Sequence, residues 1–74
     1  AQKDYKTLLQ EVVQKNRGEK LDYKIISEQG PAHERVFTCE VYLNSNSIGK
    51  GEGSSKKNAE QMAAKQALSL MGIA

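Results

Sequence analysis

Hydrophobic residues near the start of the chain follow a helical spacing. They recur three and four positions apart and form one apolar stripe: Tyr5, Leu8, Leu9, Val12 and Val13. This stripe predicts an amphipathic helix over residues 4–16. Asp4 is the expected N-cap, because its carboxylate can accept hydrogen bonds from the free amides of the first turn. Gly18 is the expected stop signal, since glycine adopts a left-handed conformation at little cost.

The middle of the chain changes to the spacing of β-strands. Residues 21–28 carry β-favouring side chains, and residues 34–43 alternate between apolar and polar positions. The apolar positions of the second segment would share one buried face: Phe37, Cys39, Val41 and Leu43. Residues 44–46, Asn-Ser-Asn, predict a tight turn, because asparagine tolerates positive φ. A short third strand follows over residues 47–52, and its glycines lead us to expect weak packing.

A second helix opens at Ser54 and Ser55, and we expect it to run to about Met71, with Gly72 as its stop. Its expected core stripe holds three small residues and two large ones: Ala59, Ala63, Ala67, Met62 and Leu70. The order of elements is helix, three strands, helix. It predicts an α+β fold in two layers, α-β-β-β-α, with a three-stranded antiparallel sheet and both helices packed on one face.

The chain has 74 residues, which is enough for one domain with one thin core. We expect that single domain to span residues 1–74, with its core at about 4–71. The first residue is Ala1 and not Met, so we expect a C-terminal fragment of a longer chain. No apolar run approaches the roughly 18 residues that would indicate a membrane span, so no membrane partner is expected.

Cys39 is the single cysteine and His33 the single histidine. An internal disulfide is therefore excluded, and a zinc site with four protein ligands is not expected. A small domain without disulfides suits a reducing, intracellular compartment, and we expect a cytoplasmic location. Mid-strand on the apolar face, Cys39 is expected to be a small core residue.

The start of the second helix carries the most informative charges. The net charge of +2 is a weak signal, so the position of the charges matters more than their sum. Lys56 and Lys57 occupy the first turn, and no acid follows until Glu60. A helix N-terminus already carries free amides and partial positive charge, and a helix built only for stability places acids there. The arrangement indicates a phosphate ligand, and the alternative is two solvated lysines.

The first helix has a polar face opposite its apolar stripe: Thr7, Gln10, Glu11 and Gln14. These mostly neutral groups suit ribose hydroxyls and base edges in a shallow groove, although an ordinary exposed face is the alternative. The third feature is the loop 30–33, Gly-Pro-Ala-His. Pro31 stiffens this loop, and His33 can donate or accept a hydrogen bond. No nucleophile and base would pair with His33, so no catalytic residue is expected.

Two further kinds of site are excluded by spacing. The glycines 49, 51 and 53 do not match the phosphate-binding loop of nucleotide-binding proteins, and the chain lacks the parallel βαβ unit of dinucleotide-binding folds. The acids are spread along the chain and form no cluster that would hold magnesium. We therefore expect no metal and no cofactor in this domain.

These segments together resemble the double-stranded RNA-binding domain, in the form that ends bacterial ribonuclease III. The matching stretches are residues 4–11, the loop 30–33 with Phe37, and residues 49–64 from the glycines through Ser55-Lys56-Lys57-Asn58-Ala59-Glu60-Gln61 to the alanine pair. The resemblance covers about residues 4–71.

The resemblance implies a role for each feature. The polar face of the first helix would enter one minor groove of duplex RNA. Pro31 and His33 would enter the next minor groove. Ser55, Lys56 and Lys57 would hold phosphates across the major groove between them. One departure is Glu60, which stands where many relatives have a third basic residue, and it weakens the expected grip on phosphate.

The expected function is binding of double-stranded RNA by shape, without catalysis in this chain. If the parent is a ribonuclease III, its magnesium-dependent nuclease segment lies outside this chain, and this domain presents the substrate to it. We expect the fragment to be a monomer, and dimerisation of the parent stays open. The alternatives are a protein-interaction or regulatory domain of the same fold and, without any supporting constellation, a small enzyme.

Overall fold

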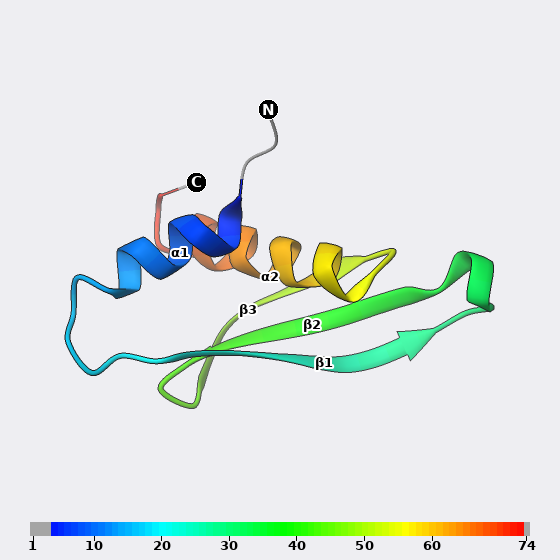
Figure 1. Ribbon diagram of the computed structural model, residues 1–74, viewed down its shortest axis with the longest axis horizontal. Helices are drawn as coiled ribbons and strands as arrows, with labels where there is room; N and C mark the ends of the chain where they lie inside the picture. The colour runs from blue at the N-terminus through cyan, green and yellow to red at the C-terminus, as the bar shows by residue number, and fades with distance from the viewer. Residues whose placement is uncertain (1–3, 74) are drawn as a thin grey trace.

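A computed structural model of the chain describes residues 4–73. Ala1, on which the expectation of a C-terminal fragment rests, lies outside this described part. The elements follow in the order α1 (Tyr5–Val13), β1 (Leu21–Gln29), the short 3-10 helix η1 (Ala32–Glu34), β2 (Val36–Leu43), β3 (Asn46–Gly53) and α2 (Lys56–Leu70). The strands form one antiparallel sheet in the order β1-β2-β3. Both helices lie on the same side of it (Figure 1). The predicted two-layer α+β fold is therefore confirmed.

The first helix is shorter than predicted. It begins after the N-cap Asp4, whose side chain accepts a hydrogen bond from Thr7 N–H at 3.0 Å, and it ends at Val13 with Gln14 as its C-cap. Gly18 has a φ of +83°, as expected for a left-handed residue, but it lies in the loop beyond the helix. Leu8, predicted in the apolar stripe, is 37 % exposed. The helix packs mainly on α2, so only one flank of its stripe is covered.

The hairpins set the register of the sheet. Leu21 pairs with Leu43 and Ile25 with Cys39, and a bulge follows that leaves Ile26 exposed. The β2–β3 turn has positive φ at its two central residues, 51° at Asn44 and 73° at Ser45. Such a pair of left-handed residues matches the twist of the strands on either side. The predicted turn is confirmed, and Cys39 is fully buried, as expected.

The expectation that β3 packs weakly is wrong. A Cβ atom added to Gly51 would lie 2.2 Å from the nitrogen of Ala63, and one added to Gly53 would lie 2.7 Å from the nitrogen of Ala59. The third glycine, Gly49, is buried in the same way. Glycines on β3 and alanines on α2 thus let two backbones touch, because neither element carries a side chain that would hold them apart. We call these facing residues the glycine–alanine contact: Gly49, Gly51 and Gly53 of β3 and Ala59, Ala63 and Ala67 of α2.

The core stripe of α2 is also rotated from the predicted one. Met62 is 37 % exposed and Leu70 74 % exposed, whereas Ala64 and Leu68 are fully buried. The three alanines of the glycine–alanine contact face the sheet. Because α1 covers the flank that carries Ala64 and Leu68, the opposite flank with Met62 and Leu70 stays open.

We expect Gly51→Ala to lower the free energy of unfolding by about 3 kcal/mol, the upper part of the range for overpacked cores. The added methyl group would overlap the backbone of α2, which cannot yield as a flexible side chain would. Urea unfolding followed by circular dichroism measures the change.

The matched control is Glu52→Ala on the exposed side of the same strand, where we expect a change within about 0.5 kcal/mol. Equal unfolding midpoints for the two variants would contradict the close contact.

Candidate nucleic-acid interface

The polar face of α1 is open to solvent. All four of its side chains, at positions 7, 10, 11 and 14, are exposed, while Leu9 and Val13 are buried on the other side of the helix. Gln14 is the C-cap residue and keeps a helical φ of −62°, so it continues the row formed by the other three. The structure thus presents a continuous row of hydroxyl, amide and carboxylate groups.

The loop between β1 and β2 has a defined backbone. Pro31 precedes η1 with a φ of −66°, and its carbonyl accepts a hydrogen bond from Glu34 N–H at 2.9 Å. Gly30 has a φ of +94°, and a Cβ atom there would lie 2.7 Å from the carbonyl oxygen of Glu34, so a larger residue would break this turn. Pro31 and His33 are both exposed. The loop therefore holds them at the tip of the hairpin.

The first turn of α2 carries two lysines and no acidic residue. Ser55 is the N-cap and accepts a hydrogen bond from Asn58 N–H at 3.0 Å. The first turn of α2 holds no acid, and Lys56 and Lys57 are exposed. Ser55 Oγ satisfies one free amide and can still donate its own proton. The remaining amides, the helix dipole and two ammonium groups combine into one region of positive potential.

These three regions lie along the long axis of the molecule, which extends 41 × 30 × 16 Å. Figure 1 shows α1 towards one end, the start of α2 near the middle and the η1 loop at the other end. They are spaced apart along one elongated body, with the start of α2 between α1 and the η1 loop. Contact of the individual residues with RNA stays a prediction.

A junction between the two helices fixes α1 to α2. The side-chain oxygen of Gln61 accepts a hydrogen bond from Tyr5 N–H at 2.8 Å, and its nitrogen donates to Asp4 Oδ1 at 2.9 Å. Asp4 Oδ1 also accepts from Thr7 N–H. Hydrogen bonds from Gln61 and then from Thr7 lower the pKa of Asp4 to about 2. Sequence reasoning assigned no role to Gln61.

Beside this junction, Glu60 pairs with α1. Its Oε1 lies 2.6 Å from Lys6 Nζ, which also lies 4.7 Å from the centre of the Tyr23 ring. The charge of Glu60, the residue that departs from the family pattern, is thus paired with Lys6 on the other helix. The Tyr23 ring lies next to Lys6, and among residues 4–73 the Tyr23 hydroxyl is buried without a hydrogen-bond partner. Burial raises the pKa of Tyr23 to about 12.

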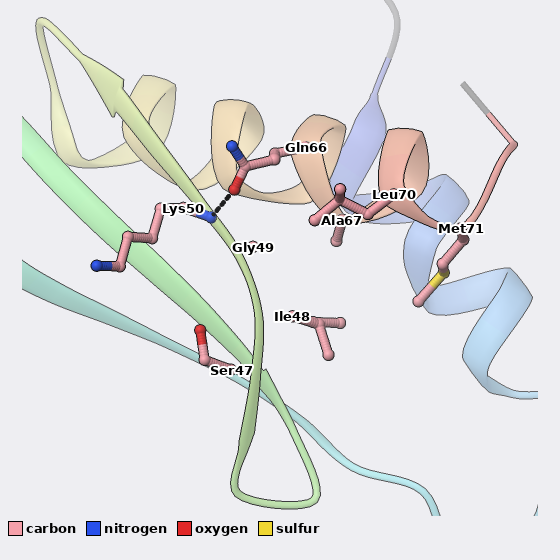
Figure 2. A pocket seen from close by; sticks show the side chains of 8 residues that line it. All are labelled: Ser47, Ile48, Gly49, Lys50, Gln66, Ala67, Leu70 and Met71. Carbon is pink, nitrogen blue, oxygen red and sulfur yellow. Dashed lines mark hydrogen bonds between the residues drawn. The ribbon is translucent and has the colours of Figure 1, made fainter.

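An apolar groove lies apart from these three regions, between β3 and the C-terminal half of α2 (Figure 2). It has a volume of about 480 Å³ and is lined by Ser47, Ile48, Gly49, Lys50, Gln66, Ala67, Leu70 and Met71. Lys50 is its one titratable side chain, so the groove offers no acid–base pair. The backbone N–H of Lys50 donates to Gln66 Oε1 at 2.6 Å, as the dashed line in Figure 2 shows.

Metal-binding groups are spread out across the part of the chain that the structure describes. No three or more His, Cys, Asp or Glu side chains gather there in a way that could hold an ion. In the same residues, neither helix is both long and apolar enough to cross a bilayer.

The comparison with known proteins agrees with the geometry. A family model described as "Double-stranded RNA binding motif" matches residues 5–71. A protein named Ribonuclease 3 from Aster yellows witches'-broom phytoplasma (strain AYWB) is 59 % identical over 66 residues, which cover 89 % of this chain and 27 % of the relative. Ribonuclease 3 from Enterococcus faecalis (strain ATCC 700802 / V583) is 54 % identical over 65 residues, or 88 % of this chain and 28 % of the relative. The chain thus spans little more than a quarter of the length of these relatives.

We expect Gln61→Ala to raise the pKa of Asp4 from about 2 towards its ordinary value of 3.8, because the variant removes the hydrogen bond that lowers this pKa most. Carboxyl titration by NMR measures the change. In the wild type, the ionised form is favoured by folding, so its contribution to stability is full above the unfolded pKa and is lost as the pH falls through about 2.

Gln66→Ala is the matched control, since it removes a side-chain amide from the same helix without touching Asp4. An unchanged Asp4 titration in Gln61→Ala would contradict the junction.

Proposed function

Because the chain belongs to the double-stranded RNA binding motif family, we propose that it binds duplex RNA through the three exposed regions described above. The observation that carries the proposal is the position of Lys56 and Lys57. They lie at a helix N-terminus without acids, between α1 and the η1 loop along the molecule (Figure 1).

The shape of A-form RNA explains the arrangement. Its major groove is deep and narrow, and its minor groove is wide, shallow and lined with 2′-hydroxyl groups. The polar face of α1 would enter one minor groove, and Pro31 and His33 of the η1 loop would enter the next. Ser55, Lys56 and Lys57 would bridge the intervening major groove by holding phosphates. Because these contacts read backbone and shape, the binding would tolerate many base sequences.

We also propose that this domain belongs to a ribonuclease and presents duplex RNA to a nuclease segment of the same protein. The relatives named Ribonuclease 3 support this assignment. The magnesium-dependent cleavage implied by the resemblance would then take place outside this chain, because the acids described here do not gather into a metal site. The domain itself would act as a monomer in the cytoplasm, where the unpaired thiol of Cys39 suits a reducing environment.

One titration separates this proposal from the alternative of a protein-interaction or regulatory domain. Duplex RNA, duplex DNA and single-stranded RNA of equal length are compared by fluorescence anisotropy. We expect duplex RNA to bind best, because DNA lacks the 2′-hydroxyl and has different groove widths. No preference for duplex RNA would overturn the proposal.

We expect Lys56→Ala and Lys57→Ala each to weaken binding to every duplex RNA and to reduce the slope of log affinity against log salt by about one. Each lysine that neutralises a phosphate releases about one counterion. Anisotropy titrations at several salt concentrations measure both quantities.

Lys24→Ala is the control, because Lys24 is exposed on β1, with its ammonium near the Tyr42 ring, away from the three regions. An unchanged slope in the Lys56/Lys57 double variant would rule out the phosphate contacts.

We expect Gln10→Ala to lower affinity by about 1 kcal/mol, the net value of one hydrogen bond, and to leave the salt slope unchanged. A neutral amide contacts hydroxyl groups or base edges and releases no counterion. The same salt series measures it, with Gln66→Ala as the matched amide control, because Gln66 is exposed on α2 and contacts Lys50 N–H and none of the three regions. A smaller slope for Gln10→Ala would show that the polar face of α1 is wrongly placed on the duplex.

A further inference from the structure

The proposed mode of binding requires a fixed separation between α1 and the start of α2. The two regions come from opposite ends of the chain, and α1 has only nine residues. It makes few contacts with the sheet and packs mainly on α2. The helix–helix junction therefore decides where the polar face of α1 lies relative to Lys56 and Lys57.

We propose that Gln61 is a positioning residue for RNA binding, which holds the N-terminus of α1 on α2 and so sets the separation between the two contact regions. This inference rests on the proposed function. It adds a residue that touches no RNA but determines whether two groups of contacts can be made together.

The hydrogen bonds of Gln61 are specific to an amide. Its oxygen accepts from Tyr5 N–H at 2.8 Å while its nitrogen donates to Asp4 at 2.9 Å. A carboxylate has no donor and would face the carboxylate of Asp4, and an ammonium has no acceptor for Tyr5 N–H. Asp4 in turn caps α1 through Thr7 N–H, so Gln61 holds the cap and the first turn at once.

The path from one contact region to the other is short. Gln61 lies four residues after Lys57, a rise of about 6 Å along α2. Gln10 lies five residues after Tyr5, a rise of about 8 Å along α1. Each path runs along a single helix, so a change at the junction would reach both regions without being absorbed by a flexible segment.

The other polar contact at this junction is weaker as a restraint. The Lys6–Glu60 ion pair is partly exposed, with side-chain exposures of 36 % and 26 %. Exposed ion pairs contribute little, because water and salt screen them, and they fix orientation poorly. Leu9 and Val13 are buried in the core, so we expect loss of Gln61 to loosen the start of α1 without unfolding the domain.

The experiment compares three variants with the wild type on one duplex RNA at neutral pH. Gln61→Met removes both hydrogen bonds at similar volume, and we expect affinity to fall roughly tenfold as the fraction of molecules with a correctly placed α1 falls. Gln61→Glu should bind at least as weakly, because two carboxylates would meet. Asp4→Asn alone keeps a side-chain oxygen that can accept from both Thr7 N–H and the Gln61 amide, so its affinity should stay within roughly twofold of the wild type.

The controls separate the proposed positioning effect of Gln61 from the effect of an added charge and from loss of folding. Gln66→Met and Gln66→Glu make the same changes on the same helix at an amide that contacts Lys50 N–H and not α1. Their affinities should stay within roughly twofold of the wild type, a difference of under ~0.5 kcal/mol. Circular dichroism checks that each variant is folded, and hydrogen exchange at the Tyr5 amide should speed up in Gln61→Met and in neither Gln66 variant.

Each result decides one of the two claims. Wild-type affinity in a folded Gln61→Met, an equal loss in Gln66→Glu and Gln61→Glu, or an equal loss in Asp4→Asn and Gln61→Met would each overturn the positioning role. A wild-type domain that does not prefer duplex RNA would overturn the proposed function itself, and the positioning role with it.

Discussion

The contact between the backbones of β3 and α2 is the constraint on which the rest of this domain depends. With glycine on one side and alanine on the other, the helix rests directly on the strand, where a Cβ at Gly51 would come within 2.2 Å of Ala63. Protein interiors transmit displacement because they are close-packed. The helix can neither slide nor tilt freely, and its N-terminal lysines have a fixed place above the sheet.

The charges at the start of α2 are not those that would best stabilise the helix. Whereas α1 begins with the carboxylate of Asp4, α2 has no acid at its N-cap or in its first turn, although an acid there would interact favourably with the helix dipole. Lys56 and Lys57 add their charges to the positive N-terminal end of the α2 dipole. The nearest acid on that helix, Glu60, is paired with Lys6 of α1. A domain that departs from a local rule at one place commonly does so where it binds something.

The sequence predicted more of the fold than of its packing. Periodicity predicted the two helices and three strands in order. Local residue types predicted Asp4 as an N-cap, the opening of the second helix at Ser54 and Ser55, and the 44–46 turn, because these signals are local. Periodicity gives the centre of an apolar stripe but not which flank a neighbour covers, so Leu70 was placed in the core and Leu68 was not. The glycines of β3 were interpreted as a sign of weak packing, because their close fit depends on alanines that lie six to eighteen positions later in the chain. Gln61 gave no signal, since its partners lie more than fifty residues away.

The hydrogen bond from Lys50 N–H to Gln66 has a consequence for the sheet as a whole. β3 is an outer strand, and a strand of this kind exposes backbone groups to which another polypeptide can add. In this protein a side chain from the covering helix occupies one of those groups, at 2.6 Å. An approaching segment would have to displace the Gln66 amide before it could pair with β3 at Lys50, so this hydrogen bond opposes edge-to-edge pairing at that point of the strand.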